Sequence, residues 1–193
     1  MTHDEAIAAI DWTAYTHPRE QLVRLGRHDF PRLLAERGLT GVGVEVGVAA
    51  GLYSKFLLDN SQLRCLTSVD DWAAPAYSRL HAACVATLSA YGERSVIIKA
   101  PSLPAVAQFH DGSVDFIHID GAHDYDNVRQ DLEAWYPKMT RGALFSGHDY
   151  HTVWPDFGVV RAVRDFADAR DVPVISITCR DVNNFPSWYW FKD

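Results

Sequence analysis

VGVEVGVAAG, residues 42–51, is the most informative stretch of this chain. Apolar residues lead to Glu45, glycines follow at Gly47 and Gly51, and LYSKFLL continues with the apolar spacing of a helix. A buried strand that passes through a glycine-rich turn into a helix is typical of nucleotide-binding domains. Glycine lets the backbone approach a ligand closely, and the helix N-terminus offers unpaired N–H groups. The stretch therefore predicts a strand, a turn and a helix that bind a nucleotide-like ligand.

The glycine spacing argues against a dinucleotide cofactor such as NAD. A dinucleotide fingerprint reads G-x-G-x-x-G and begins just after the strand. Counted from Gly41 and Gly43, the third glycine would fall at position 46, which is Val, and the residues before Gly41 resemble a helix. The spacing present is acidic-x-Gly-x-x-x-Gly. A carboxylate at this position would repel a pyrophosphate but suits an ammonium group, so a dehydrogenase is the least favoured enzyme class.

Composition and charge narrow the class of protein further. The 193 residues predict one domain, 1–193, with a helical N-terminal extension over 1–38. A net charge of −7 without a Lys/Arg-rich run disfavours nucleic acid as a partner, and three cysteines without a C-x-x-C pair disfavour a disulfide scaffold or structural zinc. The acidic N-terminus lacks a signal-peptide pattern, and no apolar run approaches the ~20 residues that span a membrane. We expect a cytoplasmic protein that acts on a small molecule, and homo-oligomer formation stays open.

From residue 42 onward, apolar strand-like runs alternate with helical stretches, which predicts a parallel sheet covered on both faces. The last two strands are joined by the turn-rich CRDVNNFP, so they should form an antiparallel hairpin at one edge of the sheet or just inside it. The expected fold is Rossmann-like and doubly wound, with a mostly parallel seven-stranded sheet and a C-terminal antiparallel β-hairpin. The expected strands are 42–47, 64–70, 95–100, 114–120, 143–149, 172–178 and 187–193. The expected helices are 3–11, 19–37, 51–59, 76–91, 102–109, 124–136 and 156–169.

Ligands of open parallel sheets bind outside the carboxyl ends of the strands. Asp70 lies at the tip of the second expected strand, where a carboxylate can accept hydrogen bonds from ribose hydroxyls; a helix N-cap or turn role is the alternative. Trp72 is a candidate for contact with the base of the nucleotide, and core packing is the alternative. Ser102 is expected to cap the helix that follows it, and contact with the base of the nucleotide is the alternative.

Two further strand ends carry acidic residues and histidines. DFIHIDGAHDY puts Asp120 at the end of the fourth expected strand, and SGHDY puts His148 and Asp149 at the end of the fifth. Since these strands should be neighbours, the three side chains should converge as a divalent-cation site. The alternative is that the carboxylates cap helices or pair with Arg129 or Arg141.

Two other histidines lie in the same block. His123 follows Asp120 by three residues, and an ordinary pKa near ~6.5 makes it a candidate general base. The alternative for His123 is to cap or orient the helix at 124–136. His118 alternates with Ile117 and Ile119, so we interpret it as a packed, hydrogen-bonded histidine.

These motifs together resemble a known enzyme family over roughly residues 40–170. The acidic-x-Gly-x-x-x-Gly turn resembles motif I of class I S-adenosylmethionine (SAM) methyltransferases. The block VDFIHIDGAHDYDNVRQDLEAWYPKMTRGALFSGHDY and the later WPDFGVVRAVRDF are similar to methyltransferase family 24, which includes macrocin-type sugar O-methyltransferases. Residues 1–38 match nothing that we can place.

The resemblance implies a SAM-dependent, metal-assisted O-methyltransferase of a small hydroxylated acceptor such as a sugar or natural product, with Mg²⁺ or Mn²⁺ as cofactor. Its His148 stands where aspartate is frequent, which would favour Mn²⁺, Fe²⁺ or Zn²⁺ over Mg²⁺. A metal-free relative that uses His148 or His123 only as a base is the alternative. The predicted cofactor-binding residues are Glu45, Gly47, Gly51, Asp70 and Trp72. The predicted metal ligands are Asp120, His148 and Asp149, and the predicted catalytic residues are His123 and Asp120.

Two rival functions remain from the sequence. One is a non-catalytic SAM-binding regulatory subunit, and the other is a related hydroxylase-type enzyme, because some hydroxylase-associated sequences share a similar IDG-x-H block. The acceptor itself is not identified by the sequence. Trp12, Tyr15, His17 and the stretch 72–77 predict an aromatic-lined acceptor pocket.

Overall fold

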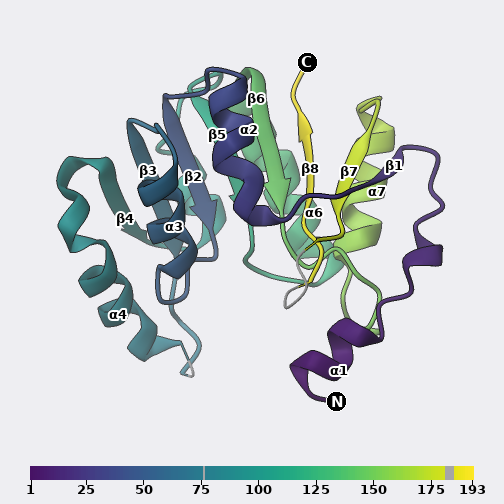
Figure 1. Ribbon diagram of the computed structural model, residues 1–193. Helices are drawn as coiled ribbons and strands as arrows, with labels where there is room; N and C mark the ends of the chain where they lie inside the picture. The colour runs from purple at the N-terminus through teal and green to yellow at the C-terminus, as the bar shows by residue number, and fades with distance from the viewer. Residues whose placement is uncertain (76, 181–184) are drawn as a thin grey trace.

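The computed structural model describes residues 1–75, 77–180 and 185–193, and its centre is a single mixed sheet (Figure 1). Across these residues eight strands pair in the order β1-β7-β8-β6-β5-β2-β3-β4. Neighbouring strands run parallel except for β8, which is antiparallel to both β6 and β7. The strands are β1 (Glu20–Val23), β2 (Val42–Val46), β3 (Cys65–Asp70), β4 (Ser95–Lys99), β5 (Val114–Ile119), β6 (Met139–Gly147), β7 (Ile175–Thr178) and β8 (Trp188–Phe191).

Helices cover both faces of the sheet, as the alternation of strands and helices predicts. Figure 1 shows α2 and α3 on one face and α6 on the other. Helices α2, α3 and α4 contribute to one hydrophobic core, and α5, α6 and α7 contribute to the other. The helices are α1 (His3–Ala8), α2 (Phe30–Glu36), α3 (Leu52–Asn60), α4 (Ser78–Leu88), α5 (Ser102–Val106), α6 (Tyr125–Trp135) and α7 (Val159–Ala169).

Successive side chains of strand β5 point to opposite faces of the sheet and so pack into the two cores alternately. Ile117 and Ile119 pack into the core beneath α5 to α7, while Phe116 packs into the core beneath α2 to α4. His118 shares the face of Phe116 and is fully buried, with its Nδ1 3.0 Å from the Ser146 hydroxyl. The prediction that His118 is a packed, hydrogen-bonded histidine is therefore confirmed.

The predicted mostly parallel sheet and its C-terminal antiparallel hairpin are confirmed. Strand β8 inserts between β6 and β7, so the hairpin lies just inside the edge rather than at it. Residues 181–184 of its connecting loop lie outside the described residues. The edge position is occupied by β1, an eighth strand that pairs in parallel with β7.

The helix expected at 19–37 was wrong over its first half. Residues 20–23 form β1, a 3₁₀ turn covers Arg27–Asp29, and only Phe30–Glu36 is α-helical. Long-range contacts override the local helical pattern here. The buried carboxylate of Glu20 accepts hydrogen bonds from the Tyr150 hydroxyl (2.6 Å) and from Arg164 Nε (2.8 Å) on α7.

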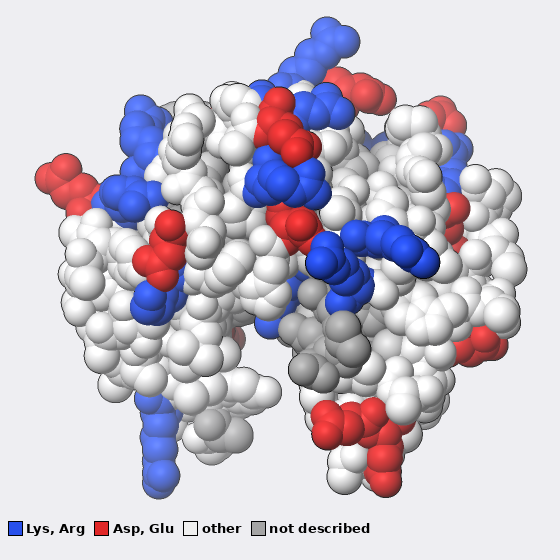
Figure 2. Space-filling view, in the orientation of Figure 1, with Lys and Arg blue, Asp and Glu red and all other residues white. Residues whose placement is uncertain are grey.

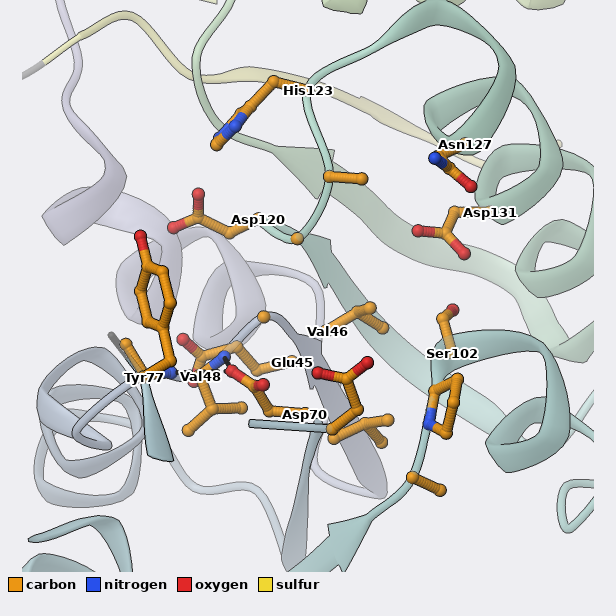
Figure 3. A pocket seen from close by; sticks show the side chains of 18 of the residues that line it. Glu45, Val46, Val48, Asp70, Tyr77, Ser102, Asp120, His123, Asn127 and Asp131 are labelled. Carbon is orange, nitrogen blue, oxygen red and sulfur yellow. Dashed lines mark hydrogen bonds between the residues drawn. The ribbon is translucent and has the colours of Figure 1, made fainter. Parts of the chain in front are cut away.

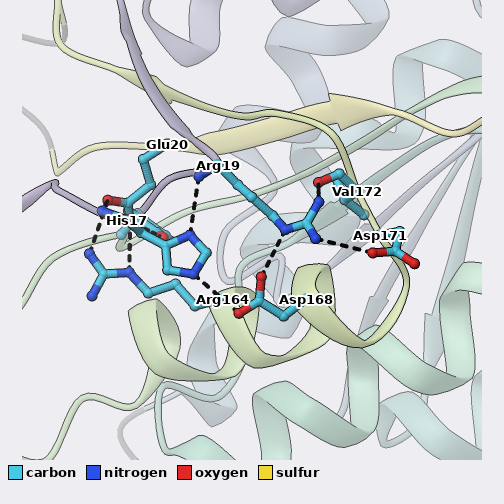
Figure 4. Close-up of polar contacts among 8 residues, drawn as sticks. His17, Arg19, Glu20, Arg164, Asp168, Asp171 and Val172 are labelled. Carbon is cyan, nitrogen blue, oxygen red and sulfur yellow. Dashed lines mark hydrogen bonds and ion pairs between the residues drawn. The ribbon is translucent and has the colours of Figure 1, made fainter.

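A second group of polar contacts fixes the chain just before β1 (Figure 4). Arg19 Nε donates to Asp168 (2.8 Å), and its Nη1 donates to the carbonyl of Val172 (2.6 Å). His17 Nε2 lies 3.2 Å from Asp168. These contacts tie the N-terminal segment to α7 and to the loop before β7.

No helix within the described residues is both long and apolar enough to cross a membrane.

Candidate active site

The turn between β2 and α3 forms one wall of a cavity at the carboxyl ends of the strands. Gly47 has a φ of +86°, and a Cβ built on it would lie 2.1 Å from the carbonyl oxygen of Asp120. This position therefore accepts only glycine, because any side chain would collide with the backbone that follows β5. The close approach follows from strand pairing, since Val46 is in register with Ile119.

Glu45 is buried at the end of β2, with 1% of its surface exposed, and it lines the cavity. Ser54 of α3 donates a hydrogen bond to its carboxylate, and the Ser54 hydroxyl lies 2.7 Å from that of Ser68 on β3. Burial raises the pKa of Glu45 to about 8, although the hydrogen bond from Ser54 opposes this rise. A cationic group entering the cavity would favour the ionised form of this carboxyl.

Asp70 lies at the tip of β3, as the sequence predicts, and it shapes the glycine-rich turn. Its Oδ2 accepts hydrogen bonds from the backbone N–H groups of Val48 and Ala49, both at 2.9 Å. Its Oδ1 accepts one from the N–H of Trp72 at 2.9 Å. The turn role that was the alternative for Asp70 is thus present. Asp70 also lines the cavity, and Oδ1 retains one site for accepting a further hydrogen bond.

An acidic and imidazole cluster lies across the cavity, after β5 and β6. Strand register brings Ile119 beside Gly147, so the residues that follow these strands are neighbours. Asp120, His123 and Asp149 each offer one ligand atom, and these three atoms lie within 4.8 Å of one another. His123 Nε2 is 2.8 Å from Asp149 Oδ2. The expected convergence of Asp120 and Asp149 is present, and His123 completes the group.

His148 approaches the same carboxylates from the buried side. Its Nδ1 lies 3.2 Å from Asp149 Oδ1 and 3.6 Å from Asp120 Oδ1. Its Nε2 is buried and has no hydrogen-bond partner among the described residues. The predicted convergence of Asp120, His148 and Asp149 is therefore present, and His123 joins the same carboxylates. The cavity face of the cluster carries His123, while His148 lies behind the carboxylates and outside the lining of the main cavity.

The carboxylates and imidazoles of this cluster stabilise one another's charged forms. Burial acts against ionisation of Asp149, but hydrogen bonds from His123 and His148 hold the pKa of Asp149 far below its usual range. Burial also acts against the charged imidazoles, yet Asp149 raises the pKa of His123, and Asp120 with Asp149 raises that of His148. Burial raises the pKa of Asp120. Asp149 has a φ of +54°, which is uncommon for a residue with a side chain and typical of functional positions.

The helix-capping alternative for His123 is not what the structure has. Asp124 is the N-cap of α6, and its side chain accepts the backbone N–H of Asn127 at 3.1 Å. The His123 ring instead stacks on Phe157, with the planes 3° apart and the centroids at 4.5 Å. The imidazole is therefore held in a fixed orientation beside Asp149.

These groups surround one cavity of about 950 Å³ (Figure 3). Figure 3 shows Glu45 and Asp70 on one side, Asp120 and His123 on another, and Asp131 with Ser102 on a third. Figure 2 shows the molecule hollowed at its lower edge and shows acidic and basic side chains interspersed on this face. The volume lies at the upper end of the usual range for small-molecule pockets.

Several predicted residues lie elsewhere. Gly51 and Trp72 are not among the described residues that line the cavity. Gly51 has a φ of +78° at the start of α3, and a Cβ there would lie 3.1 Å from Cys84 Sγ of α4. Trp72 is 2% exposed, and its indole N–H donates to the carbonyl of Ala49 at 2.8 Å. Core packing, the alternative for Trp72, is what the structure has. Ser102 does line the cavity, but as the first residue of α5 it makes no N-cap hydrogen bond, so the expected cap is wrong.

The expected aromatic acceptor pocket is also largely absent from the cavity wall. Tyr15 stacks on Tyr150, and His17 pairs with Asp168. Trp12 is 38% exposed and packs beside Tyr15. Of the aromatic residues predicted there, Tyr77 lines the cavity, and Ala74 of the same stretch lines it too.

The sequence reasoning missed Arg27, which lies near the centre of the site. Arg27 precedes α2 and lines the cavity, with its Nη1 3.4 Å from Asp120 Oδ2. Its guanidinium lies over the ring of Tyr53, 4.8 Å from the centroid. The Tyr53 hydroxyl donates to the Arg27 carbonyl at 3.0 Å. No motif marks Arg27, because it comes from the N-terminal segment that matched no family pattern.

Comparisons with known proteins agree with this geometry. A family model described as a methyltransferase domain matches residues 44–150. An uncharacterized protein of Sinorhizobium fredii is 33% identical over 69 residues, which are 36% of this chain and only 8% of that protein's length.

Solved structures share the fold at low sequence identity. An O-methyltransferase from Bacillus cereus in complex with SAH aligns with a TM-score of 0.65 at 15% identity, over 99% of this chain and 90% of that one. The O-methyltransferase TomG from Streptomyces achromogenes, in complex with SAM and involved in tomaymycin synthesis, aligns with a TM-score of 0.60 at 13% identity. That alignment covers 86% of this chain and 79% of TomG.

Proposed function

The chain belongs to methyltransferase family 24, a family of class I SAM-dependent methyltransferases, and from this premise we propose that it methylates a hydroxyl oxygen of a small acceptor with the help of a divalent cation. A sugar or another hydroxylated natural product is the proposed acceptor class. One observation carries the proposal. Asp120, His123 and Asp149 converge on the cavity that the glycine-rich turn after β2 also lines.

The residues of the cavity fit SAM. The cofactor supplies an electrophilic methyl group on a sulfonium. Gly47 lines the cavity, and only glycine can stand there because the Asp120 carbonyl fills the direction of a Cβ. The buried carboxyl of Glu45 suits the ammonium end of the cofactor, and Asp70 suits the ribose hydroxyls. The proposed cofactor residues are therefore Glu45, Gly47 and Asp70.

The donor set also fits a divalent cation. Two carboxylates and an imidazole are ligands for Mn²⁺, Fe²⁺ or Zn²⁺, and with added water also for Mg²⁺. We assign Asp120, His123 and Asp149 as the ligands. His148 would hold both carboxylates from behind through Nδ1. A cation bound there would lower the pKa of the acceptor hydroxyl and fix its position.

The chain's own residues must also remove the proton of the acceptor. Without a bound cation, Nε2–H of His123 donates to Asp149, so Nδ1 carries the lone pair and can accept that proton. With the cation bound, His123 is one of its ligands and cannot also take the proton. Asp120 is the second candidate, because burial raises its pKa and makes it more basic than an ordinary carboxylate. Arg27 beside Asp120 keeps this carboxylate in place. Aiming the oxygen at the methyl group and excluding water supply the rest of the rate enhancement.

Calorimetry with SAM tests the proposal, first on protein treated with EDTA and then after Mn²⁺ or Mg²⁺ is added back. We expect SAM to bind and the metal to give a separate heat. Asp149→Ala should lose the metal heat and keep SAM binding. Asp156→Ala, which removes an exposed carboxylate from the following loop, serves as the matched control.

Each other outcome has a defined meaning. SAM binding without a metal heat would show that the cation is not part of the mechanism, and His123 would remain as the proposed base. SAM binding without turnover on a panel of sugars and vicinal diols would favour the non-catalytic subunit. Turnover that needs oxygen and a reductant would indicate the hydroxylase-type enzyme. A wild-type protein that binds no SAM would overturn the proposal.

A further inference from the structure

Residues 1–20 lie before the part of the chain that the family model matches, yet they pack against the backbone that carries the proposed metal ligand Asp149. The Tyr15 hydroxyl donates to the carbonyl of Tyr150 at 2.8 Å. The two tyrosine rings stack, with their centroids 5.9 Å and their planes 24° apart. Tyr150 is fully buried and directly follows Asp149 in the chain. Tyr15 thus binds the backbone one residue beyond a proposed ligand of the cation.

The backbone at Asp149 has a conformation that needs support from its surroundings. Its φ of +54° is unfavourable for a residue with a side chain, and such residues persist only where neighbouring contacts fix the chain. Before Asp149, the His148 N–H donates to the carbonyl of Ile119 at 3.0 Å. After it, the Tyr150 N–H donates to the carbonyl of Pro186 at 2.9 Å. The bond from the Tyr15 hydroxyl is a further support on this second side.

The hydroxyl of Tyr15 is itself a well-fixed donor. Burial and the nearby carboxylate of Glu20 raise the pKa of Tyr15, so the hydroxyl keeps its proton and can donate at neutral pH. The Tyr150 hydroxyl donates to Glu20 at 2.6 Å, and Arg164 Nε donates to the same carboxylate at 2.8 Å. The N-terminal residues therefore bind Tyr150 at its carbonyl and at its hydroxyl.

Helix α1 packs toward a second proposed ligand through a layer of aromatic rings. Ile10, which follows α1, packs with Phe185 in a small hydrophobic cluster. The Phe185 ring lies 4.1 Å from the ring of His151, and His151 stacks on Phe157 at 5.0 Å. Phe157 is the ring on which His123 stacks. The N-terminal residues thus support the site from the side opposite the cavity.

We propose that Tyr15 is a positioning residue for the metal site, because its hydroxyl holds the backbone that follows Asp149 and so raises the affinity for a divalent cation. Partners outside the ligand set orient the ligands, and their loss weakens metal binding. Without the hydroxyl, the Tyr150 carbonyl loses a donor and the left-handed residue before it is held less firmly. The inference rests on the proposed function, since it requires a cation at Asp120, His123 and Asp149.

Tyr15→Phe tests the inference, because it removes the hydroxyl and keeps the ring that stacks on Tyr150. Calorimetry on protein freed of metal with EDTA and then dialysed should show Mn²⁺ binding weakened roughly 10-fold. SAM affinity should stay at the wild-type value, since the proposed SAM residues lie on β2, on β3 and in the turn after β2. Tyr91→Phe is the matched control, because the Tyr91 hydroxyl also donates a hydrogen bond, to Asp59, and Tyr91 is not among the described residues that line the cavity. It should keep the wild-type Mn²⁺ affinity.

A second measurement uses the wild-type protein alone. Coupling between two binding events is reciprocal, so residues that strengthen cation binding must be held more firmly once the cation is bound. Hydrogen exchange of the backbone amides at residues 12–20, followed by mass spectrometry, should therefore slow when Mn²⁺ is added. Exchange over β4, at the other edge of the sheet, should stay unchanged.

The outcomes separate this inference from the proposed function. A Tyr15→Phe protein that is less stable to urea but binds Mn²⁺ as tightly as the wild type would overturn the inference, because Tyr15 would then serve the fold alone. Exchange at residues 12–20 that does not respond to bound Mn²⁺ would overturn it as well, and this result does not depend on a variant that folds. Both results leave the proposed function intact. A wild type that gives no Mn²⁺ heat would overturn the proposed cation and this inference together.

Discussion

Replacing Glu45 by glutamine should stabilise the ligand-free protein at pH 8 and change its stability little at pH 5. Burial raises the pKa of Glu45 from 4.5 to about 8 in the folded state. The folded state therefore holds this proton more tightly than the unfolded state, and stability is lost as the pH rises from about 4.5 toward 8. At ~1.36 kcal/mol per pKa unit, the carboxyl costs on the order of 3 kcal/mol more at pH 8 than at pH 5.

Glutamine is nearly isosteric, stays neutral across this range and can still accept the hydrogen bond from Ser54. Urea unfolding followed by circular dichroism at pH 5 and pH 8 measures the difference, with Glu93→Gln as the control for an exposed glutamate. Calorimetry on the same proteins should show weaker SAM binding to Glu45→Gln, because the ammonium loses its counter-charge. A Glu45→Gln protein whose stability changes with pH just as the wild type's does would refute the reasoning.

Two more substitutions, each with a control, test the backbone geometry at Gly47 and the contacts by which Glu20 holds the N-terminal segment against α7. Gly47→Ala should abolish SAM binding and cost more than ~2 kcal/mol of unfolding free energy, since φ is +86° and the new Cβ would lie 2.1 Å from a carbonyl oxygen. Gly142→Ala, with φ +80° and open space around the Cβ, should cost about 1 kcal/mol, and equal losses in urea unfolding would contradict the steric argument. Glu20→Gln should cost ~1–3 kcal/mol in the same assay, because its side chain is 1% exposed and binds an arginine and a tyrosine. Asp168→Asn, in a pair whose carboxylate is 53% exposed, should cost less than ~1 kcal/mol, and the reverse order would refute this anchor.

The fold from residue 42 onward could be predicted because its information is local. Apolar runs such as FIHI and glycine-bearing turns mark strands and their ends within a few residues. Strand β1 could not be predicted in this way. Its residues EQLV are short and half polar, and they are strand because β7, Tyr150 and Arg164 hold them from more than 100 positions away. A helical pattern in the sequence carries no record of such partners.

The site was predictable where strand register alone positions a side chain. Asp120 and Asp149 meet because β5 and β6 are parallel neighbours whose carboxyl ends coincide. Which histidine faces the cavity depends on finer geometry. His148 is 7% exposed and does not line the main cavity, while His123 lines it and stacks on Phe157. Periodicity does not encode either feature.

Asp131 did leave a signal in the sequence. The buried residues of α6 are Val128, Asp131, Leu132 and Trp135, which follow the i, i+3, i+4, i+7 spacing of a core-facing stripe. A carboxyl inside an apolar stripe is unfavourable for folding, and the same is true of Glu45 inside an apolar strand. Each lines the same cavity, and Ser54 donates a hydrogen bond to Glu45. A ligand that brings a cationic or hydrogen-bond-donating group to each carboxyl would compensate both, which is why we interpret their burial as serving binding rather than stability.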